Sequence, residues 1–538
     1  MRRYLTNEWA TPRITLDRPC SMQQTDIYKC QINHNKERRL RMRVSFDVRD
    51  ADADTLSRPE LRPLTMVSAD SHVCLPPKMY KNYLDPQYHD SWGGYLDDVA
   101  VINKVVELTG YPAPADALKI YDKRGVVSAA GEVGYFDPVW RLRQVEAEGI
   151  AAEFLHPFGP LGFVPFNDVQ NSRCSHELRV AGARAHNRFL EEFCSEAPGR
   201  LLGVPLIYPW PDWDAGVADI ARARQAGFHA IFPPMMPGTP DDLPALYDGW
   251  WDPMWAACQD LGMVVHIHAG FGNPQGGVVE MVRSVFSRTE GDSADTAGKE
   301  GLAAIDPNLL PKFDPDASAD AGGTNSFLSE LFETFGERRP LWQLMWGGVF
   351  DRFPKLKVAF QEIHADWVPA TLAYLDRAHA ANPGPMKLTP SEYWARHCAV
   401  GTSLMRYGDV AVRHEVGLDK MMFGSDFPHF EGTWPNTHDW IRTTLGSVPE
   451  VEARAILGEN AIDFYGLDRA LLEKTAKRVG PLPGQLFNGQ PVDPKLIRHF
   501  EFRAGINKPV NFDVDQMNQA FEADRAGATQ ALAAGKSA

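Results

Sequence analysis

Short apolar runs alternate with amphipathic stretches from about Val67 to Leu467, and no other feature of this chain restricts its fold as much. Strands that alternate with helices in this way pair in parallel as βα units. The eight units present here predict closure into a (β/α)8 barrel, with a doubly wound open sheet as the alternative. The candidate strands cover residues 66–72, 150–156, 200–207, 227–234, 263–269, 357–364, 398–404 and 420–427.

The segments between these runs carry helical patterns and include two long connections. One helical stretch ends in Pro198 and Gly199, which together form a helix stop signal. The connections at 73–136 and 270–325 are long for a compact domain, in which such loops usually act as lids or are disordered. Helices are predicted over residues 137–149, 176–199, 212–227, 326–336 and 367–380.

The two ends of the chain differ from residues 66–468, which we expect to form the barrel. Residues 1–65 are rich in Arg, Asp and Thr and show little sustained periodicity, which predicts a loosely ordered arm. Met66 stands immediately before the first strand, so a protein that begins there is an alternative. Residues 469–538 form an extension that is turn-rich at first and Ala-rich from Gln519, and it is expected to wrap a neighbour or hang free.

Composition excludes several classes of function. Hydrophobic residues make up 44% of the chain and charged residues 23%, as in a globular protein with a large core. The net charge of −15 argues against binding to nucleic acid or to an anionic membrane, because both need a basic face. The seven scattered cysteines contain no CxxC pair, which suits reduced thiols in a cytoplasm. The sequence shows neither a signal-peptide pattern nor the ~20 apolar residues of a membrane span.

Acidic residues and histidines stand at the ends of four of the predicted strands. Burying such side chains costs free energy unless they are paired or bind a metal. The carboxyl ends of barrel strands are also where barrel enzymes place their active sites. Residues two apart in a strand point the same way, so each pair below is expected to share one face. These residues are Asp70 and His72 on the first strand, His266 and His268 on the fifth, Glu362 and His364 on the sixth, and Asp426 on the eighth.

Each of these features also has a structural explanation when it is taken alone. A single D-x-H occurs by chance in many proteins, and H-x-H at a strand end can be two hydrogen-bonded core histidines. Asp426 can cap the turn that follows it. Together the features favour a divalent metal site, and because no thiol is well placed, both Zn²⁺ and Mn²⁺ suit the donors.

Four segments that carry these residues resemble the strand-end motifs of a known family. The segments are VSADSH, VVHIHAG, FPKLKVAFQEIHADWVP and MMFGSDFPHFEGTWP. They are similar to the motifs of the amidohydrolase-related family, amidohydrolase 2, over roughly residues 66–468. That family includes non-oxidative decarboxylases as well as hydrolases, so the resemblance implies a metal-dependent barrel enzyme with either activity.

The resemblance also implies a ligand set. Asp70 and His72 match the family's first metal motif, His268 matches its strand-5 histidine, and Asp426 matches its strand-8 aspartate. His266 would lie one layer deeper, as a support or an alternative ligand. The fourth predicted strand, GFHAIFPP, has no lysine to carry a bridging carbamate, so one metal ion is expected, Zn²⁺ first and Mn²⁺ as the alternative.

Hydrolysis of a small organic substrate by metal-activated water is the first expectation. Asp426 would accept the proton of the attacking water, and Glu362 or His364 would carry a proton to the leaving group. The family's decarboxylases have a catalytic histidine where this chain has Glu362, so decarboxylation of an aromatic or enoic acid is the alternative. A barrel that binds a ligand without catalysis is the third hypothesis, and the presence of the ligand residues argues against it.

Two further histidines are weaker candidates. His156, in a loop after the second strand, either touches substrate or has a structural role. His429 is expected to support the metal site from outside the ligand set. The expected partners are a small-molecule substrate and, because of the terminal segments, a second copy of the chain in a homodimer.

Overall fold

The computed structural model describes most of the predicted barrel. The predicted helix at 326–336, the arm up to residue 61 and the 270–325 connection lie wholly or mostly outside the part that it describes. The described residues are 62–96, 99, 115–157, 164–167, 174–235, 243–272, 336–429, 431–508 and 513–535.

Every predicted apolar run contains a strand, and all of these strands except β3, which extends to Pro157, are shorter than the runs. The first run covers two strands that both pair with the second run, and residues 69–71 separate them. The strands are β1 (Met66–Ser68), β2 (His72–Val73), β3 (Ile150–Pro157), β4 (Leu201–Gly203), β5 (Ala230–Ile231), β6 (Val264–His268), β7 (Lys357–Gln361), β8 (Cys398–Ser403) and β9 (Met421–Gly424).

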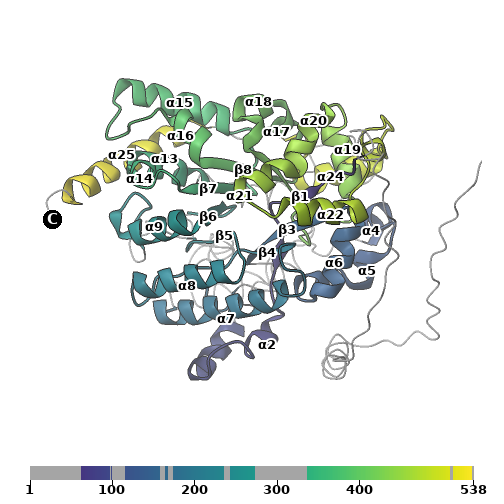
Figure 1. Cartoon of the computed structure of the whole chain (residues 1–538), viewed down its shortest axis with the longest axis horizontal. Coiled ribbons are helices and arrows are strands. Elements are labelled where there is room, and N and C mark those ends of the chain that lie inside the picture. The colour runs from purple at the N-terminus through teal and green to yellow at the C-terminus, as the bar shows by residue number, and fades with distance from the viewer. Residues whose placement is uncertain are drawn as a thin grey trace, which may run out of the picture. The chain divides into compact units, whose positions relative to one another are not determined.

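The strands form a closed ring. All named pairings are parallel, with β4, β3, β1 and β2 in one group and β5 to β9 in the other. Two parallel bridges join the groups, Leu206 to Phe232 on one side and Ser71 to Phe427 on the other. The N–H of His72 donates to the Phe427 carbonyl at 2.8 Å across the second junction. The predicted (β/α)8 barrel is therefore confirmed over the open sheet, and Figure 1 shows its strands surrounded by helices.

Helices follow the strands around the ring. Asp137, Ser175 and Asp212 each cap a helix by accepting a hydrogen bond from a backbone N–H of its first turn. The helix predicted to reach Gly199 ends at Cys194. The barrel helices include α6 (Pro138–Ala147), α7 (His176–Cys194), α8 (Trp213–Gln225), α9 (Asp252–Leu261), α13 (Arg339–Trp346), α14 (Val349–Arg352), α15 (Val368–Ala381), α16 (Pro390–His397), α17 (Tyr407–Ala411), α18 (Arg413–Val416), α19 (Thr437–Leu445), α20 (Glu450–Arg454) and α21 (Asn460–Tyr465).

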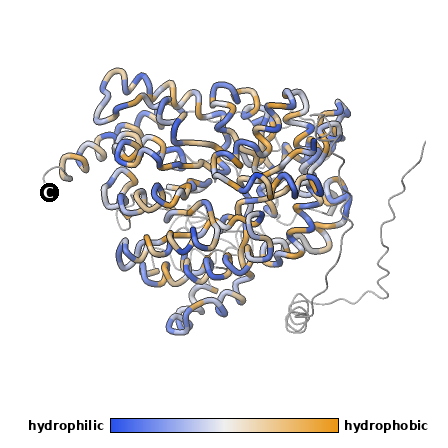
Figure 2. The backbone as a smooth tube through the Cα atoms, viewed as in Figure 1, coloured by the Kyte–Doolittle hydropathy of each residue, from blue (hydrophilic) through white to orange (hydrophobic). Residues whose placement is uncertain are grey.

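Side chains alternate between the inside of the ring and the surrounding helices. On β6, Val264 belongs to the hydrophobic cluster inside the barrel, whereas Val265 and Ile267 pack in the outer cluster under the helices. The period of two then places His266 and His268 inside the barrel. Hydrophobic and hydrophilic stretches alternate along the outer helices, as expected for helices with one buried face (Figure 2).

The C-terminal extension is helical and packed. It contains α22 (Arg469–Val479), α23 (Pro483–Leu486), α24 (Pro494–Ala504) and α25 (Val514–Gly535). On α25 the buried carboxylate of Asp524 accepts hydrogen bonds from Arg339, Trp342 and Gln343 of α13, at 2.7–3.0 Å. Figure 1 shows α25 beside α13, so the described part of this tail does not hang free.

The last part of the predicted N-terminal arm packs against the rest of the chain. Leu64, inside the predicted N-terminal arm, is fully buried, and its N–H donates to the Pro481 carbonyl at 2.9 Å. Among the described helices, none combines the length and the apolar character that crossing a bilayer requires.

Candidate metal centre

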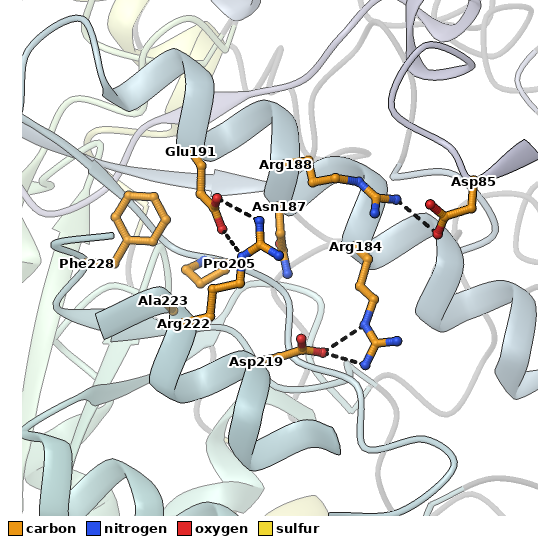
Figure 3. Close-up of a pocket in the computed structure, with 10 residues that line it drawn as sticks. All are labelled: Asp85, Arg184, Asn187, Arg188, Glu191, Pro205, Asp219, Arg222, Ala223 and Phe228. Carbon is orange, nitrogen blue, oxygen red and sulfur yellow. Dashed lines mark hydrogen bonds and ion pairs between the residues drawn. The ribbon is translucent and has the colours of Figure 1, made fainter. Parts of the chain in front are cut away.

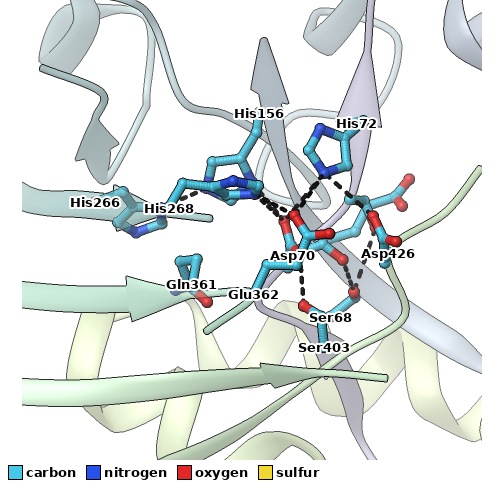
Figure 4. A network of polar contacts seen from close by, with 12 residues as sticks. Ser68, Asp70, His72, His156, His266, His268, Gln361, Glu362, Ser403 and Asp426 are labelled. Atoms are coloured by element: carbon cyan, nitrogen blue, oxygen red, sulfur yellow. Dashed lines mark hydrogen bonds and ion pairs between the residues drawn. The ribbon is translucent and has the colours of Figure 1, made fainter. Parts of the chain in front are cut away.

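Polar side chains converge at the carboxyl ends of β1, β2, β6, β7 and β9 (Figure 4). Asp70, His72, His268 and Glu362 each present one donor atom, and these four atoms lie within 4.8 Å of one another. His268 Nε2 is 3.3 Å from Asp70 Oδ1 and 3.1 Å from Glu362 Oε2. His72 Nε2 is 3.6 Å from Asp70 Oδ1. Three imidazole or carboxylate donors therefore meet within the span of one ion's coordination shell, and Glu362 adds a fourth.

A second set of donors shares His72 and Glu362 with the first and adds Asp426 and His429. Asp426 Oδ1 lies 3.2 Å from His72 Nε2 and 2.8 Å from His429 Nδ1. The two imidazole rings of His72 and His429 stack with their centroids 3.8 Å apart. The structure thus brings all four predicted ligands, Asp70, His72, His268 and Asp426, to one site, with Glu362 and His429 beside them.

The hydrogen bonding of this site fits a metal ion. Both ring nitrogens of His72 and both carboxylate oxygens of Asp426 are buried without a hydrogen bond to any described residue. Leaving such groups unsatisfied would cost free energy, and a divalent cation would satisfy them. Imidazole and carboxylate are ligands that Zn²⁺ and Mn²⁺ accept.

The charges of the site fit a metal ion as well. Burial, and then the nearby charge of Asp426, raise the pKa of Glu362 well above its usual range. Burial, followed by Glu431 and Asp70, also raises the pKa of Asp426. Carboxylates crowded in this way repel one another, and a bound cation would offset that repulsion.

The sequence predicted that Glu362 and His364 share one face of a strand, and this prediction is wrong. Strand β7 ends at Gln361, and both residues adopt the left-handed conformation, with φ of 57° and 58°. The period of two therefore does not extend to them. Glu362 turns into the metal centre, whereas His364 Nδ1 lies 3.2 Å from Asp409 Oδ2.

Close polar contacts hold Asp70 from several sides. Ser403 Oγ donates to Asp70 Oδ2 at 2.5 Å, and His156 Nδ1 lies 2.8 Å from Asp70 Oδ1. His156 Nε2 is in turn 2.7 Å from His266 Nδ1. His156, one of the two weaker candidates, and His266, predicted as a support or an alternative ligand, therefore lie behind Asp70 rather than among the grouped donors. Sequence analysis missed Ser403, although this residue lies next to the end of the predicted seventh strand, 398–404, where a site residue is expected.

Comparison with known proteins decides the family. The model of a family described as amidohydrolase matches residues 175–467, more than half of the chain. The chain belongs to the amidohydrolase family. Its members are metal-dependent enzymes of the amidohydrolase superfamily, which includes carboxy-lyases. No curated protein matches the chain.

Solved structures similar to this amidohydrolase share little of its sequence. An amidohydrolase from Mycobacterium avium subsp. paratuberculosis K-10 has a TM-score of 0.50 and 18% identity, over 75% of this chain and 99% of that chain. The 5-carboxyvanillate decarboxylase from Sphingomonas paucimobilis has a TM-score of 0.49 and 18% identity, over 75% and 100%. The 2,6-dihydroxybenzoate decarboxylase from Rhizobium has a TM-score of 0.47 and 18% identity, over 74% and 98%. The similarity to the first of these structures supports the barrel fold, but it carries no information about substrate or reaction.

A buried arginine holds the backbone of this amidohydrolase at the metal centre. Arg141 on α6 is fully buried and forms a two-pronged ion pair with Glu153, at 2.6 and 2.9 Å. Its Nη1 also donates to the His72 carbonyl at 2.6 Å, and its Nη2 donates to the Phe427 carbonyl at 3.1 Å. One side chain thus links the strand end that carries His72 to the loop that follows Asp426. Sequence analysis missed it, because its partners lie far away in the sequence.

A pocket on the outer side of the barrel has a different character (Figure 3). It lies between α7 and α8 and contains none of the metal-centre residues. Its arginines are neutralised by neighbouring carboxylates, so the pocket offers no unpaired cation for an acidic ligand. The pairs are Arg222 with Glu191 at 2.8 Å, Arg184 with Asp219 at 3.0 Å and Arg188 with Asp85 at 3.2 Å.

Proposed function

We propose that this amidohydrolase hydrolyses a small organic substrate at a single divalent metal ion. The observation that carries the proposal is the convergence of Asp70, His72, His268 and Asp426 at the carboxyl ends of the barrel strands. Two carboxylates and two imidazoles from different strands leave room for a water molecule on the ion, as a hydrolytic site requires.

We infer that Zn²⁺ is the resident ion and that Mn²⁺ is the alternative, since both accept these donors. When bound, the ion would lower the pKa of a water molecule and polarise the substrate carbonyl. Glu362 stands close enough to the donors to act as a further ligand, with its Oε2 3.1 Å from His268 Nε2. His266 is not part of the inferred set, because both of its ring nitrogens contact other side chains.

Asp426 is suited to accept the proton of the attacking water. Neither of its oxygens accepts a hydrogen bond from the described residues, although His429 Nδ1 lies 2.8 Å from its Oδ1. It also shares the centre with His72, so an inferred ligand water would lie within its reach. This proximity satisfies the geometric requirement for a general base.

Two residues are suited to protonate the leaving group. Glu362 lies at the centre, with its Oε2 3.1 Å from His268 Nε2, so its carboxyl group is within reach of a leaving group held there. His364 is oriented by the buried carboxylate of Asp409, which also accepts hydrogen bonds from the N–H groups of Ala365 and Arg406. A carboxylate on Nδ1 leaves Nε2 of His364 as the atom that exchanges a proton.

Decarboxylation of an aromatic or enoic acid is the second candidate, and the His364–Asp409 pair is the observation that favours it. An oriented imidazole is the kind of acid that could protonate the substrate carbon. Glu362 argues for hydrolysis, because a carboxylate at the centre would repel a substrate carboxylate unless it were protonated or offset by the metal.

The location and assembly are also inferences. We infer a cytoplasmic protein, since the cysteines of the described residues, Cys74, Cys174, Cys194, Cys258 and Cys398, are free thiols. A homodimer stays a prediction from the terminal segments.

Product analysis tests the reaction class. The Zn²⁺-loaded enzyme is incubated in ¹⁸O-labelled water with panels of lactones, amides and aromatic acids. Hydrolysis predicts one labelled oxygen in the product of a turned-over lactone or amide. Release of CO2 from an acid, with no water-derived oxygen in the product, would replace the hydrolase proposal with the decarboxylase.

A further inference from the structure

We propose that Tyr465 is a positioning residue for the metal centre, because its hydroxyl fixes the direction of proton donation along a buried chain of polar contacts that ends on Asp70. The proposal rests on the inferred role of Asp70 as a metal ligand. Tyr465 lies at the end of α21, in the segment that follows the last strand of the barrel, and it is buried.

The chain runs through the barrel interior, from Gln361 to Asp70. Gln361 Nε2 donates to the Tyr465 hydroxyl at 2.8 Å, and that hydroxyl lies 2.8 Å from His266 Nε2. His266 Nδ1 is 2.7 Å from His156 Nε2, and His156 Nδ1 is 2.8 Å from Asp70 Oδ1. Gln361, His266 and His156 are fully buried, so none of these contacts competes with bulk water.

If the rings of His266 and His156 are neutral, only one placement of their protons is compatible with the contacts at both ends of the chain. Because Gln361 donates to the Tyr465 oxygen, the hydroxyl proton is free to point at His266 Nε2, which then accepts. His266 must carry its proton on Nδ1, and this proton points at His156 Nε2. His156 therefore carries its own proton on Nδ1 and donates it to Asp70.

The contact between His156 and Asp70 requires the same direction of proton donation along the chain. A nitrogen 2.8 Å from a carboxylate oxygen must carry a proton, since two lone pairs at this distance would repel each other. With neutral rings the reverse direction would place the His156 proton on Nε2 and leave a lone pair facing Asp70. Burial raises the pKa of Tyr465 well above its usual range, which keeps the hydroxyl protonated as the first donor.

The chain and Ser403 together fix the Asp70 carboxylate. Ser403 donates to Oδ2 at 2.5 Å, while His156 Nδ1 lies 2.8 Å from Oδ1. The carboxylate plane is thereby set before any metal binds, and the remaining lone pairs face the centre. Residues that orient a ligand in this way typically change metal affinity by ~10–100-fold when they are replaced. Tyr465 is two contacts further from the metal, so we expect a smaller factor, roughly 3–10.

The first test needs no substitution. Ring-¹⁵N-labelled histidine is incorporated into the full chain, and the ¹⁵N shifts of the Zn²⁺-loaded protein report which ring nitrogens carry protons. The proposal predicts that His266 and His156 both carry the proton on Nδ1 and not on Nε2. A proton on Nε2 of His266 would overturn it.

The second test compares two tyrosines. Tyr465→Phe removes the hydroxyl and should weaken Zn²⁺ binding by roughly 3–10-fold, measured by competition with a chelator, and shift the His266 tautomer signals. Tyr80→Phe is the matched control, because the Tyr80 hydroxyl also contacts a buried histidine, His186, at 2.9 Å, but away from the centre. Tyr80→Phe should leave Zn²⁺ affinity unchanged. Equal affinities in the two variants would contradict the proposal.

The same measurements separate this proposal from the proposed function. If His268→Ala bound Zn²⁺ as well as the wild type, the metal-site assignment would fall, whatever the tautomers of His156 and His266. If His268→Ala lost Zn²⁺ but Tyr465→Phe kept full affinity, only the positioning role of Tyr465 would fall.

Discussion

The imidazole ring of His429 stacks on that of His72 with a centroid distance of 3.8 Å and an interplanar angle of 25°. His429 thereby limits the rotation of an inferred ligand. Its Nδ1 also lies 2.8 Å from Asp426 Oδ1, so one side chain contacts two of the four inferred ligands.

Replacing His429 should therefore weaken metal binding without abolishing it. We expect His429→Gln to lower Zn²⁺ affinity by ~10-fold, since replaced supporting residues typically cost ~10–100-fold. Chelator competition measures the affinity. His438→Gln is the control, because His438 contacts the backbone carbonyl of Glu148 and lies outside the donor groups. Unchanged affinity in His429→Gln would show that the stacked ring is not a support.

Replacing Glu362 separates proton transfer from metal binding. Glu362→Gln keeps the shape of the side chain and removes the titrating group, so kcat should fall by ~10²–10⁴-fold. Metal content should stay near that of the wild type, because the four inferred ligands remain. The comparison needs kcat and metal analysis on the same preparation. Loss of the metal together with activity would instead make Glu362 a ligand.

Arg141 should matter for stability far more than an exposed arginine. Arg141→Lys keeps the charge but loses the fork that contacts Glu153 and two backbone carbonyls, so we expect a loss of about 3 kcal/mol in the free energy of unfolding. Arg184→Lys, at a partly exposed pair with Asp219, should cost less than about 1 kcal/mol. Urea denaturation measures both. Equal losses of unfolding free energy in the two variants would show that Arg141 does not stabilise the protein by joining the strand ends.

A buried histidine remote from the metal centre should make the protein sensitive to acid. Burial lowers the pKa of His186 to about 3. In the unfolded chain its pKa is about 6.5, so the stabilisation is complete above that pH and is lost as the pH falls toward 3.

The stability advantage of the wild type over His186→Gln should shrink by about 3 kcal/mol between pH 7.5 and pH 4. Urea denaturation of both proteins across this range measures it. Parallel pH dependences would show that His186 does not titrate as its burial demands.

Local patterns predicted the barrel and much of its centre. The predicted alternation of strands and helices is present in the folded chain, because each strand of the barrel buries both of its faces. The period of two on β6 placed His266 and His268 inside, since Val265 and Ile267 face the helices as the pattern requires.

Local sequence patterns did not predict the turns and long-range contacts of the site. The positive φ of Glu362 and His364 ends the period of two, and no local pattern announces it. Arg141 and Tyr465 act through partners far away in the sequence, whose positions depend on closure of the barrel. The Ala-rich tail from Gln519 gave no sign of packing, because Asp524 finds its partners on α13 only in the folded chain.

Metal content of a matched pair of histidine variants tests the central claim most directly. His268 lies in the donor group, whereas His379 lies on α15, outside it. Purified wild type should contain close to one equivalent of Zn²⁺ or Mn²⁺, His379→Ala should match it, and His268→Ala should have lost most of its metal. Equal metal content in the two variants would contradict the metal centre proposed here.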